Sequence, residues 1–64
     1  MPVVRIDLWE GRDGKIKEEL IRRVTETVAR TLEIAEKSVW VILDETPKAH
    51  WGIGGKLGTE FDPK

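Results

Sequence analysis

Residues 39–43, Val39-Trp40-Val41-Ile42-Leu43, decide the fold of this 64-residue chain. The stretch has no polar residue and is dominated by β-branched and aromatic side chains, a composition that predicts a β-strand buried on both faces. Asp44 and Glu45 follow it and are expected to end the strand. A strand of this kind needs neighbouring elements over both of its faces.

Residues Val3 to Trp9 predict a second strand, because apolar residues alternate there with other types. One set of alternate positions holds Val4, Ile6 and Leu8, and the other holds Val3, Arg5, Asp7 and Trp9. Such alternation is typical of a strand with one well-buried face.

Between the two strands, from about Gly14 to Glu33, the apolar residues follow the period of a helix. They are Ile16, Leu20, Ile21, Val24, Val28 and Leu32. Asp13 precedes the stretch and is expected to cap it. The other face carries charge pairs at four-residue spacing, which are Lys15–Glu19, Glu18–Arg22, Glu19–Arg23 and Glu26–Arg30. Pairs at this spacing support a solvated helix face.

The order strand, helix, strand predicts an α/β fold, a right-handed βαβ unit with two parallel strands, as a single domain over residues 1–64. One helix covers only one face of such a sheet, so another subunit must cover the rest. After Pro47 comes His50-Trp51-Gly52-Ile53-Gly54-Gly55-Lys56-Leu57, a glycine-rich stretch that predicts a short β-hairpin able to reach a neighbour.

Length and composition also favour an oligomer. A chain of this size buries only about 60% of the surface that its unfolded form exposes. It has no cysteine and a single histidine, so neither disulfides nor a structural metal site can stabilise it. Its three tryptophans suit a subunit interface, although they suit a small core equally well.

Several classes of partner are not expected. Eleven basic and twelve acidic residues are spread along the chain, which is no signature of nucleic-acid or membrane binding. The N-terminus does not resemble a signal peptide, and no apolar run is long enough to span a membrane, so a cytoplasmic protein is expected. The segment Gly52–Lys56 lacks the spacing of a phosphate loop and the following helix of a dinucleotide site.

Pro2 and Arg12 are the candidate catalytic residues. If Met1 is removed, Pro2 presents a secondary amine, and a pocket that desolvates its cation would leave an unprotonated base near neutral pH. Arg12 follows the first strand and has a planar fork suited to a carboxylate. Taken alone, each has an ordinary explanation, since proline often follows the initiator methionine and a loop arginine is often only solvated.

Together these features resemble the 4-oxalocrotonate tautomerase family over nearly the whole chain. The matching segments are Met1-Pro2, Leu8-Trp9-Glu10-Gly11-Arg12, Lys17-Glu18-Glu19-Leu20-Ile21, Val39-Trp40-Val41-Ile42 with Glu45, and His50 to Leu57. The resemblance implies the tautomerase fold, a homohexamer built as a trimer of dimers, and sites that combine residues of more than one chain. It also implies a keto–enol isomerase of enol or 2-oxo carboxylates that uses no metal or cofactor.

The resemblance assigns a role to each candidate residue. Pro2 is the general base, and Arg12 binds the carboxylate of a small substrate and draws electron density from the reacting carbon. Trp51 matches an aromatic wall of the pocket, Ile53 an apolar lining position, and Trp9 a position at its mouth.

Trp40 departs from the family pattern, because the position usually holds a second arginine. An indole N–H donates one hydrogen bond but cannot neutralise charge. A larger or aromatic 2-oxo acid, or its enol, is therefore expected to fit better than a diacid. The alternative is that Trp40 packs in a subunit interface.

Two other functions stay open from the sequence. A chain that keeps Met1 has an amide at Pro2 and no basic nitrogen, and would be a non-catalytic oligomeric scaffold or binding module. A hydratase or dehalogenase of the same superfamily is less expected, since that branch carries an acidic residue at the position of Ile53.

Overall fold

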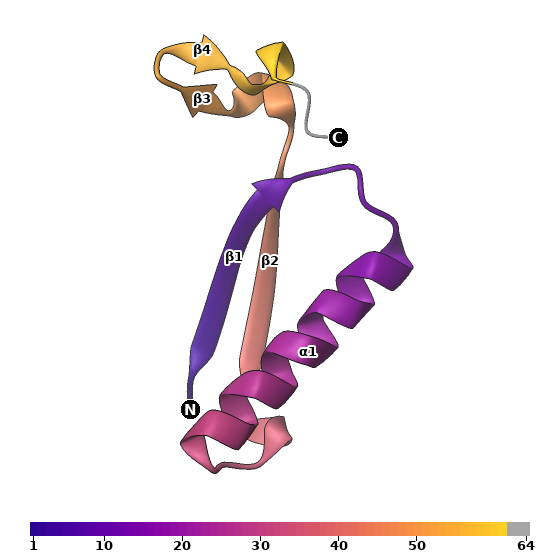
Figure 1. The fold of residues 1–64 in the computed structure, drawn as a ribbon, viewed down its shortest axis with the longest axis vertical. Coiled ribbons are helices and arrows are strands. Elements are labelled where there is room, and N and C mark those ends of the chain that lie inside the picture. The colour runs from indigo at the N-terminus through magenta and orange to yellow at the C-terminus, as the bar shows by residue number, and fades with distance from the viewer. Residues whose placement is uncertain (62–64) are drawn as a thin grey trace.

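Two parallel strands and one helix form most of the computed structural model, which describes residues 1–61 (Figure 1). The elements are β1 (Val3–Trp9), α1 (Gly14–Leu32), β2 (Trp40–Thr46), β3 (Gly52–Ile53) and β4 (Lys56–Leu57). Three short 3-10 helices lie in the connections, at Glu36–Ser38, Lys48–His50 and Gly58–Glu60. The predicted α/β architecture, with its C-terminal hairpin, is confirmed.

The parallel pairing of β1 with β2 begins with Val3 opposite Trp40 and ends with Trp9 opposite Thr46. The prediction that Asp44 and Glu45 end the second strand is wrong. Both residues continue it, because β1 offers ladder partners as far as Trp9 and this pairing outweighs their low strand propensity. Glu10 extends the ladder by donating its backbone N–H to the Thr46 carbonyl at 3.1 Å.

The helix begins and ends close to the predicted limits. The Asp13 carboxylate accepts a hydrogen bond from the Ile16 backbone N–H at 2.9 Å, which confirms the predicted cap. At the other end Glu33 has a φ of 58° and donates its backbone N–H to the last turn. This left-handed conformation ends helices and usually belongs to glycine.

The ion pairs on the outer face of the helix match the prediction only in part. Arg23 pairs with Glu19 as expected, but Arg22 pairs with both Glu19 and Glu26. Glu26 therefore pairs with the arginine four residues before it, and not with Arg30. The hydrogen bonds from Arg23 and then Arg22 lower the pKa of Glu19, an effect that solvent screens on this exposed face.

One face of the sheet is covered by the helix (Figure 1). The half-buried residues Val4, Ile6 and Leu8 alternate along β1 as predicted, while Val3, Arg5 and Asp7 between them are exposed. In parallel register, Val41 and Leu43 of β2 lie beside Val4 and Ile6. Lys17 of α1 pairs with Glu45 of β2 at 3.0 Å, so an ion pair links the start of the helix to the end of the second strand.

The other face of the sheet is open, so the prediction that the second strand is buried on both faces fails for the single chain. Trp40 is 54% exposed and Val3 beside it 53%. Among the described residues, Ala29 and Val39 are the buried hydrophobic side chains. The chain exposes 5014 Å², whereas a compact monomer of this mass exposes about 4,200 Å². Its radius of gyration is 14.4 Å, against about 11 Å for a compact domain of this length.

The hairpin of β3 and β4 stands beyond the carboxyl end of β2 (Figure 1). Gly54 and Gly55 connect its strands with φ values of 59° and 86°. Two consecutive positive φ values match the type I′ turn, whose twist suits a two-residue hairpin and which glycine adopts without strain. No helix in residues 1–61 has the length and apolar character needed to cross a membrane.

The Asp13 cap gives a test of the helix start. Asp13→Ala removes the acceptor for the Ile16 N–H and should lower the free energy of unfolding by about 1 kcal/mol. Asp13→Asn is the matched control, because asparagine caps equally well without the charge. Urea titration at one fixed protein concentration measures both variants. Equal losses in the two variants would contradict the assignment of the effect to the cap.

Candidate active site

Pro2 and Trp40 lie together at the amino ends of the two parallel strands. The Pro2 carbonyl accepts a hydrogen bond from the Trp40 backbone N–H at 3.0 Å, and Val3 stands opposite Trp40 in the sheet. With Met1 attached, the Pro2 nitrogen is an amide of the Met1–Pro2 bond and is not basic. The pairing therefore places the backbone of Pro2 beside the backbone of Trp40, whose side chain is exposed.

Arg12 lies at the opposite end of β1. Its side chain donates from Nη1 to the Trp9 carbonyl at 3.0 Å, which holds the guanidinium near the last residue of the strand. Gly11, just before it, has a φ of 123°, a conformation that other residues rarely adopt. A guanidinium has five N–H donors, so this one bond leaves donors available for a carboxylate.

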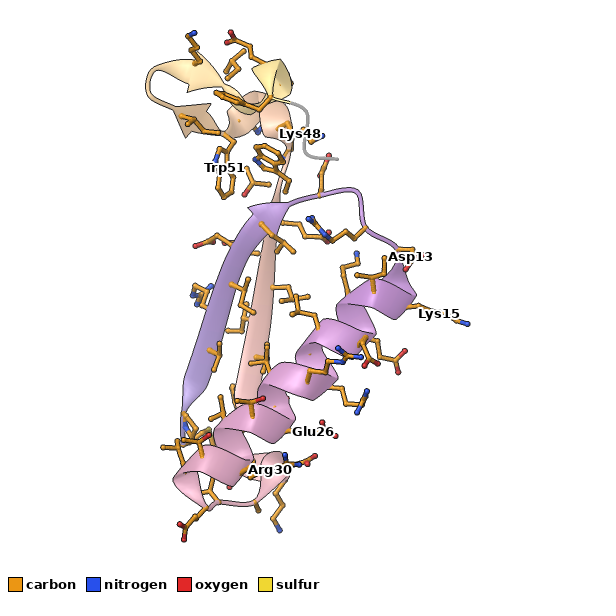
Figure 2. All side chains as sticks on the ribbon, viewed as in Figure 1. Asp13, Lys15, Glu26, Arg30, Lys48 and Trp51 are labelled. Atoms are coloured by element: carbon orange, nitrogen blue, oxygen red, sulfur yellow. The ribbon has the colours of Figure 1, made fainter. Side chains whose placement is uncertain are left out.

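Trp9 and Trp51 form an aromatic pair at the same end. Their ring centroids are 5.9 Å apart with planes at 80°, an edge-to-face arrangement. Trp51 lies between the hairpin and the end of the sheet, with Lys48 close by (Figure 2). Ile53, on β3, is 38% exposed and so remains accessible for an apolar contact. The end of the molecule that holds the hairpin therefore contains Arg12, Trp9, Trp51 and Ile53.

Lys48 is a further member of this cluster that the sequence did not single out. Its Nζ lies 5.2 Å from the centroid of the Trp9 ring, within the range of a cation–π interaction. No local pattern signals this contact, because Lys48 and Trp9 are far apart in the sequence and meet only through the pairing of β1 with β2.

Gly58 allows the hairpin to close against the tryptophans. A Cβ at Gly58 would lie 2.8 Å from the Lys48 carbonyl oxygen and 3.2 Å from atoms of both Trp9 and Trp51. The Gly58 N–H donates to the Trp51 carbonyl at 2.7 Å. The segment can pass this close only because glycine has no side chain.

Trp9 also carries an unpaired donor. Its indole Nε1 is buried and has no hydrogen-bond partner among the described residues. Buried polar groups are normally paired, so water, a second chain or a bound molecule is expected to supply an acceptor here. The searched residues contain no group of three or more His, Asp or Glu side chains placed to hold a metal ion.

The candidate residues therefore form two half-sites at opposite ends of β1. Pro2 precedes β1 and Arg12 follows it, and the seven residues of that strand extend for about 23 Å. The hydrogen bond to the Trp9 carbonyl holds the Arg12 side chain at the carboxyl end of β1, so the guanidinium cannot reach Pro2 of the same chain. A small carboxylate cannot touch both residues of one chain, so a site that uses both needs at least two copies.

A sequence model of the family described as "Tautomerase enzyme" matches residues 2–60, and the chain belongs to this family, whose members are isomerases. The similar proteins named below are tautomerases, which favours an enzyme of this kind over a scaffold or a hydratase.

The relatives and similar structures agree with this assignment. A 2-hydroxymuconate tautomerase of Pseudomonas putida is 45% identical over 60 residues, which are 94% of this chain and 95% of the relative. The crystal structure of a 4-oxalocrotonate tautomerase homologue is 39% identical, covers 97% of this chain and 98% of its own, and has a TM-score of 0.87. A heterohexameric 4-oxalocrotonate tautomerase of Chloroflexus aurantiacus has a TM-score of 0.89 at 32% identity, covering 97% of this chain and 100% of its own.

The close approach at Gly58 gives a test of the aromatic cluster. Gly58→Ala should lower the free energy of unfolding by about 1–3 kcal/mol, because the new methyl group meets a backbone oxygen that cannot easily move. It should also change the near-ultraviolet circular dichroism of the tryptophans. Gly52→Ala is the matched control in the same hairpin, since no atom lies within 4 Å of its Cβ position. A Gly58→Ala protein with wild-type stability and spectrum would contradict the packing described here.

Proposed function

We propose that this tautomerase works without a cofactor, with Pro2 of one chain as general base and Arg12 of another chain as carboxylate ligand. The observation that carries the proposal is the separation of Pro2 and Arg12 by the length of β1. Each half-site has tryptophan beside it, so their combination across two chains would enclose a substrate between a base, a fixed cation and aromatic walls. The chain acts in this proposal as one domain.

The proposed reaction is a proton transfer within a conjugated enol or 2-oxo carboxylate. After removal of Met1, the lone pair of the Pro2 nitrogen takes the proton from the enol hydroxyl, or from the carbon next to a carbonyl. The resulting prolinium returns a proton to another carbon of the conjugated system, so the base is regenerated and the double bonds have moved. Apolar surroundings favour the neutral amine over its cation and so favour the base form.

Arg12 would bind the substrate carboxylate through its remaining donors and stabilise the negative charge that develops when the proton leaves. A preorganised charged donor of this kind typically contributes a factor of about 10²–10³ to turnover. Trp51, Ile53 and Trp9 would exclude water from the pocket, which strengthens the interaction between the guanidinium and the anion.

Trp40 is proposed to shape the preference for substrate. Its backbone bond to Pro2 and its 54% exposure support a place for the indole beside the base. An indole offers a flat apolar surface and no charge, so we propose that an aromatic or larger 2-oxo acid binds better than the diacid 2-hydroxymuconate on which relatives act. The alternative role, packing against another subunit, uses the same exposed surface.

The assembly is proposed to be a homohexamer, a trimer of dimers. The large exposed surface and the open sheet face of the single chain support an oligomer. The heterohexamer among the similar structures supports six chains. The cytoplasmic location expected from the sequence remains a prediction.

Mixed assemblies test the shared site. Pro2→Ala and Arg12→Ala should each lower kcat/KM by a factor of about 10² or more, since one removes the ring amine and the other the carboxylate ligand. When the two variants are refolded together, random exchange should give about a quarter of sites an intact Pro2 and an intact Arg12. Activity with phenylenolpyruvate and 2-hydroxymuconate should then recover to about that fraction.

Intact-mass measurement of each protein confirms beforehand that Met1 has been removed. The two variants mixed without refolding serve as the control for exchange. A mixture that forms hybrid assemblies by native mass spectrometry yet recovers no activity would rule out a site shared in this way. Wild-type protein that lacks Met1 and isomerises neither substrate would contradict the role of Pro2.

Trp40→Arg tests the substrate preference. The new guanidinium should raise kcat/KM for the diacid 2-hydroxymuconate about tenfold and lower it for phenylenolpyruvate. Trp40→Phe is the matched control, because it keeps an aromatic surface and adds no charge. Unchanged rates for both substrates with intact assembly would instead assign Trp40 to packing.

A further inference from the structure

Lys48 carries a charge that faces an aromatic ring and takes part in none of the ion pairs within residues 1–61. The residue is half-buried, and its Nζ lies 5.2 Å from the centroid of the Trp9 ring. Lysine usually keeps its ammonium in water. The Lys48 carbonyl accepts the Trp51 backbone N–H at 3.2 Å, and the two residues lie side by side (Figure 2). Lys48 therefore contacts both tryptophans of the cluster, one through its backbone and the other through its charge.

The Trp9 indole has a reason to leave its place beside Trp51. Its Nε1 is buried and finds no acceptor among the described residues. A buried donor without a partner loses its hydration, so rotation of the indole into water would lower the free energy of this group. The Trp9 backbone is held by the ladder with Thr46 and by the hydrogen bond from Arg12 to its carbonyl, which leaves only the side-chain torsions free to change. The position of the indole therefore depends on the contacts of its ring.

Two contacts of the ring oppose that rotation. One is the edge-to-face contact with Trp51, with ring centroids 5.9 Å apart, and the other is the ammonium of Lys48. Each contact is of the same order of magnitude as the opposing loss of hydration. The balance between an inward and an outward indole therefore depends on the charge of Lys48.

We propose that Lys48 is a positioning residue, which holds the Trp9 indole inward so that it forms a wall of the substrate pocket. The proposal rests on the proposed function, in which Trp9 excludes water from that pocket. Loss of the ammonium lets the indole rotate into water, whereas Arg12 keeps its place because it is bonded to the Trp9 backbone. The pocket then loses apolar surface but keeps its base and its carboxylate ligand. Substrate binding therefore weakens, most for a substrate with an aromatic ring, while turnover of bound substrate is preserved.

Hydrogen exchange of the Trp9 indole N–H tests the position of the ring independently of activity. Lys48→Met keeps the length of the side chain and removes its charge, and exchange should become about tenfold faster because the N–H reaches water more often. Lys48→Arg keeps a cation over the ring and should exchange like the wild type. Lys15→Met is the matched control, since it removes the same charge from an exposed position of α1. NMR of the isotope-labelled assembly measures the exchange, and the Trp9 signal is the one that Trp9→Phe removes.

Steady-state kinetics test the consequence for the pocket. Lys48→Met should raise KM for phenylenolpyruvate about fivefold and leave kcat within about twofold of the wild type, because the base and Arg12 stay in place. The increase for 2-hydroxymuconate, which has no aromatic ring, should be smaller. Lys48→Arg should restore the KM of the wild type.

A Trp9→Leu background separates positioning from direct contact with the substrate. No ring remains there for the ammonium to hold, so Lys48→Met should change KM no further. If Lys48 instead bound the substrate carboxylate itself, the increase in KM would persist in that background, and this result would overturn the proposal.

Unchanged exchange of the Trp9 N–H in Lys48→Met would overturn it as well, because another contact, such as an acceptor on a second chain, would then hold the indole. Equal acceleration in Lys48→Arg would also count against it, since the effect would then come from the shape of the side chain and not from its charge. A wild-type protein without tautomerase activity would contradict the proposed function alone, because the exchange measurement still decides whether Lys48 holds the ring.

Discussion

The parallel pairing of β1 with β2 is the constraint on which the rest of the molecule depends. It places the amino ends of both strands together, so that Pro2 and Trp40 become neighbours, and the carboxyl ends together, so that Trp9 lies near the hairpin. Because parallel strands require a long crossover, the helix must span one face, and a chain this short has no element left for the other. The open face and the unpaired edge both follow from this pairing.

The carboxyl end of the sheet is ordered by contacts between segments distant in sequence. Trp9 at the end of β1 meets Trp51 before the hairpin, and Lys48 lies over the Trp9 ring. Gly58 brings the end of the hairpin close to both tryptophans. These contacts position the aromatic surface and Arg12 on the same end of the chain, which gives the hairpin a defined place although its strands are only two residues long.

The sequence predicted the elements well where a single local pattern controls them. Alternation along β1, the helical period of α1 and the Asp13 cap each reflect interactions within a few residues, and all three are confirmed. Of the predicted apolar stripe, however, Ile16, Ile21 and Leu32 are exposed in the single chain. The prediction failed at Asp44 and Glu45, where ladder pairing with β1 overrides local propensity. The predicted burial of β2 on both faces is also not met within the single chain, because its one helix covers only one face of the sheet and leaves Trp40 exposed.

The sequence by itself determined the βαβ fold and indicated the need for oligomerisation, and its motifs resemble those of the tautomerase family to which the chain belongs. It also named the candidate residues Pro2, Arg12, Trp9, Trp51, Ile53 and Trp40. Only the tertiary structure decided how these residues group, with Pro2 and Trp40 at one end of β1 and the others at the opposite end. The reason is physical: residue type fixes the chemistry that a side chain can perform, whereas strand length and register fix which side chains can meet.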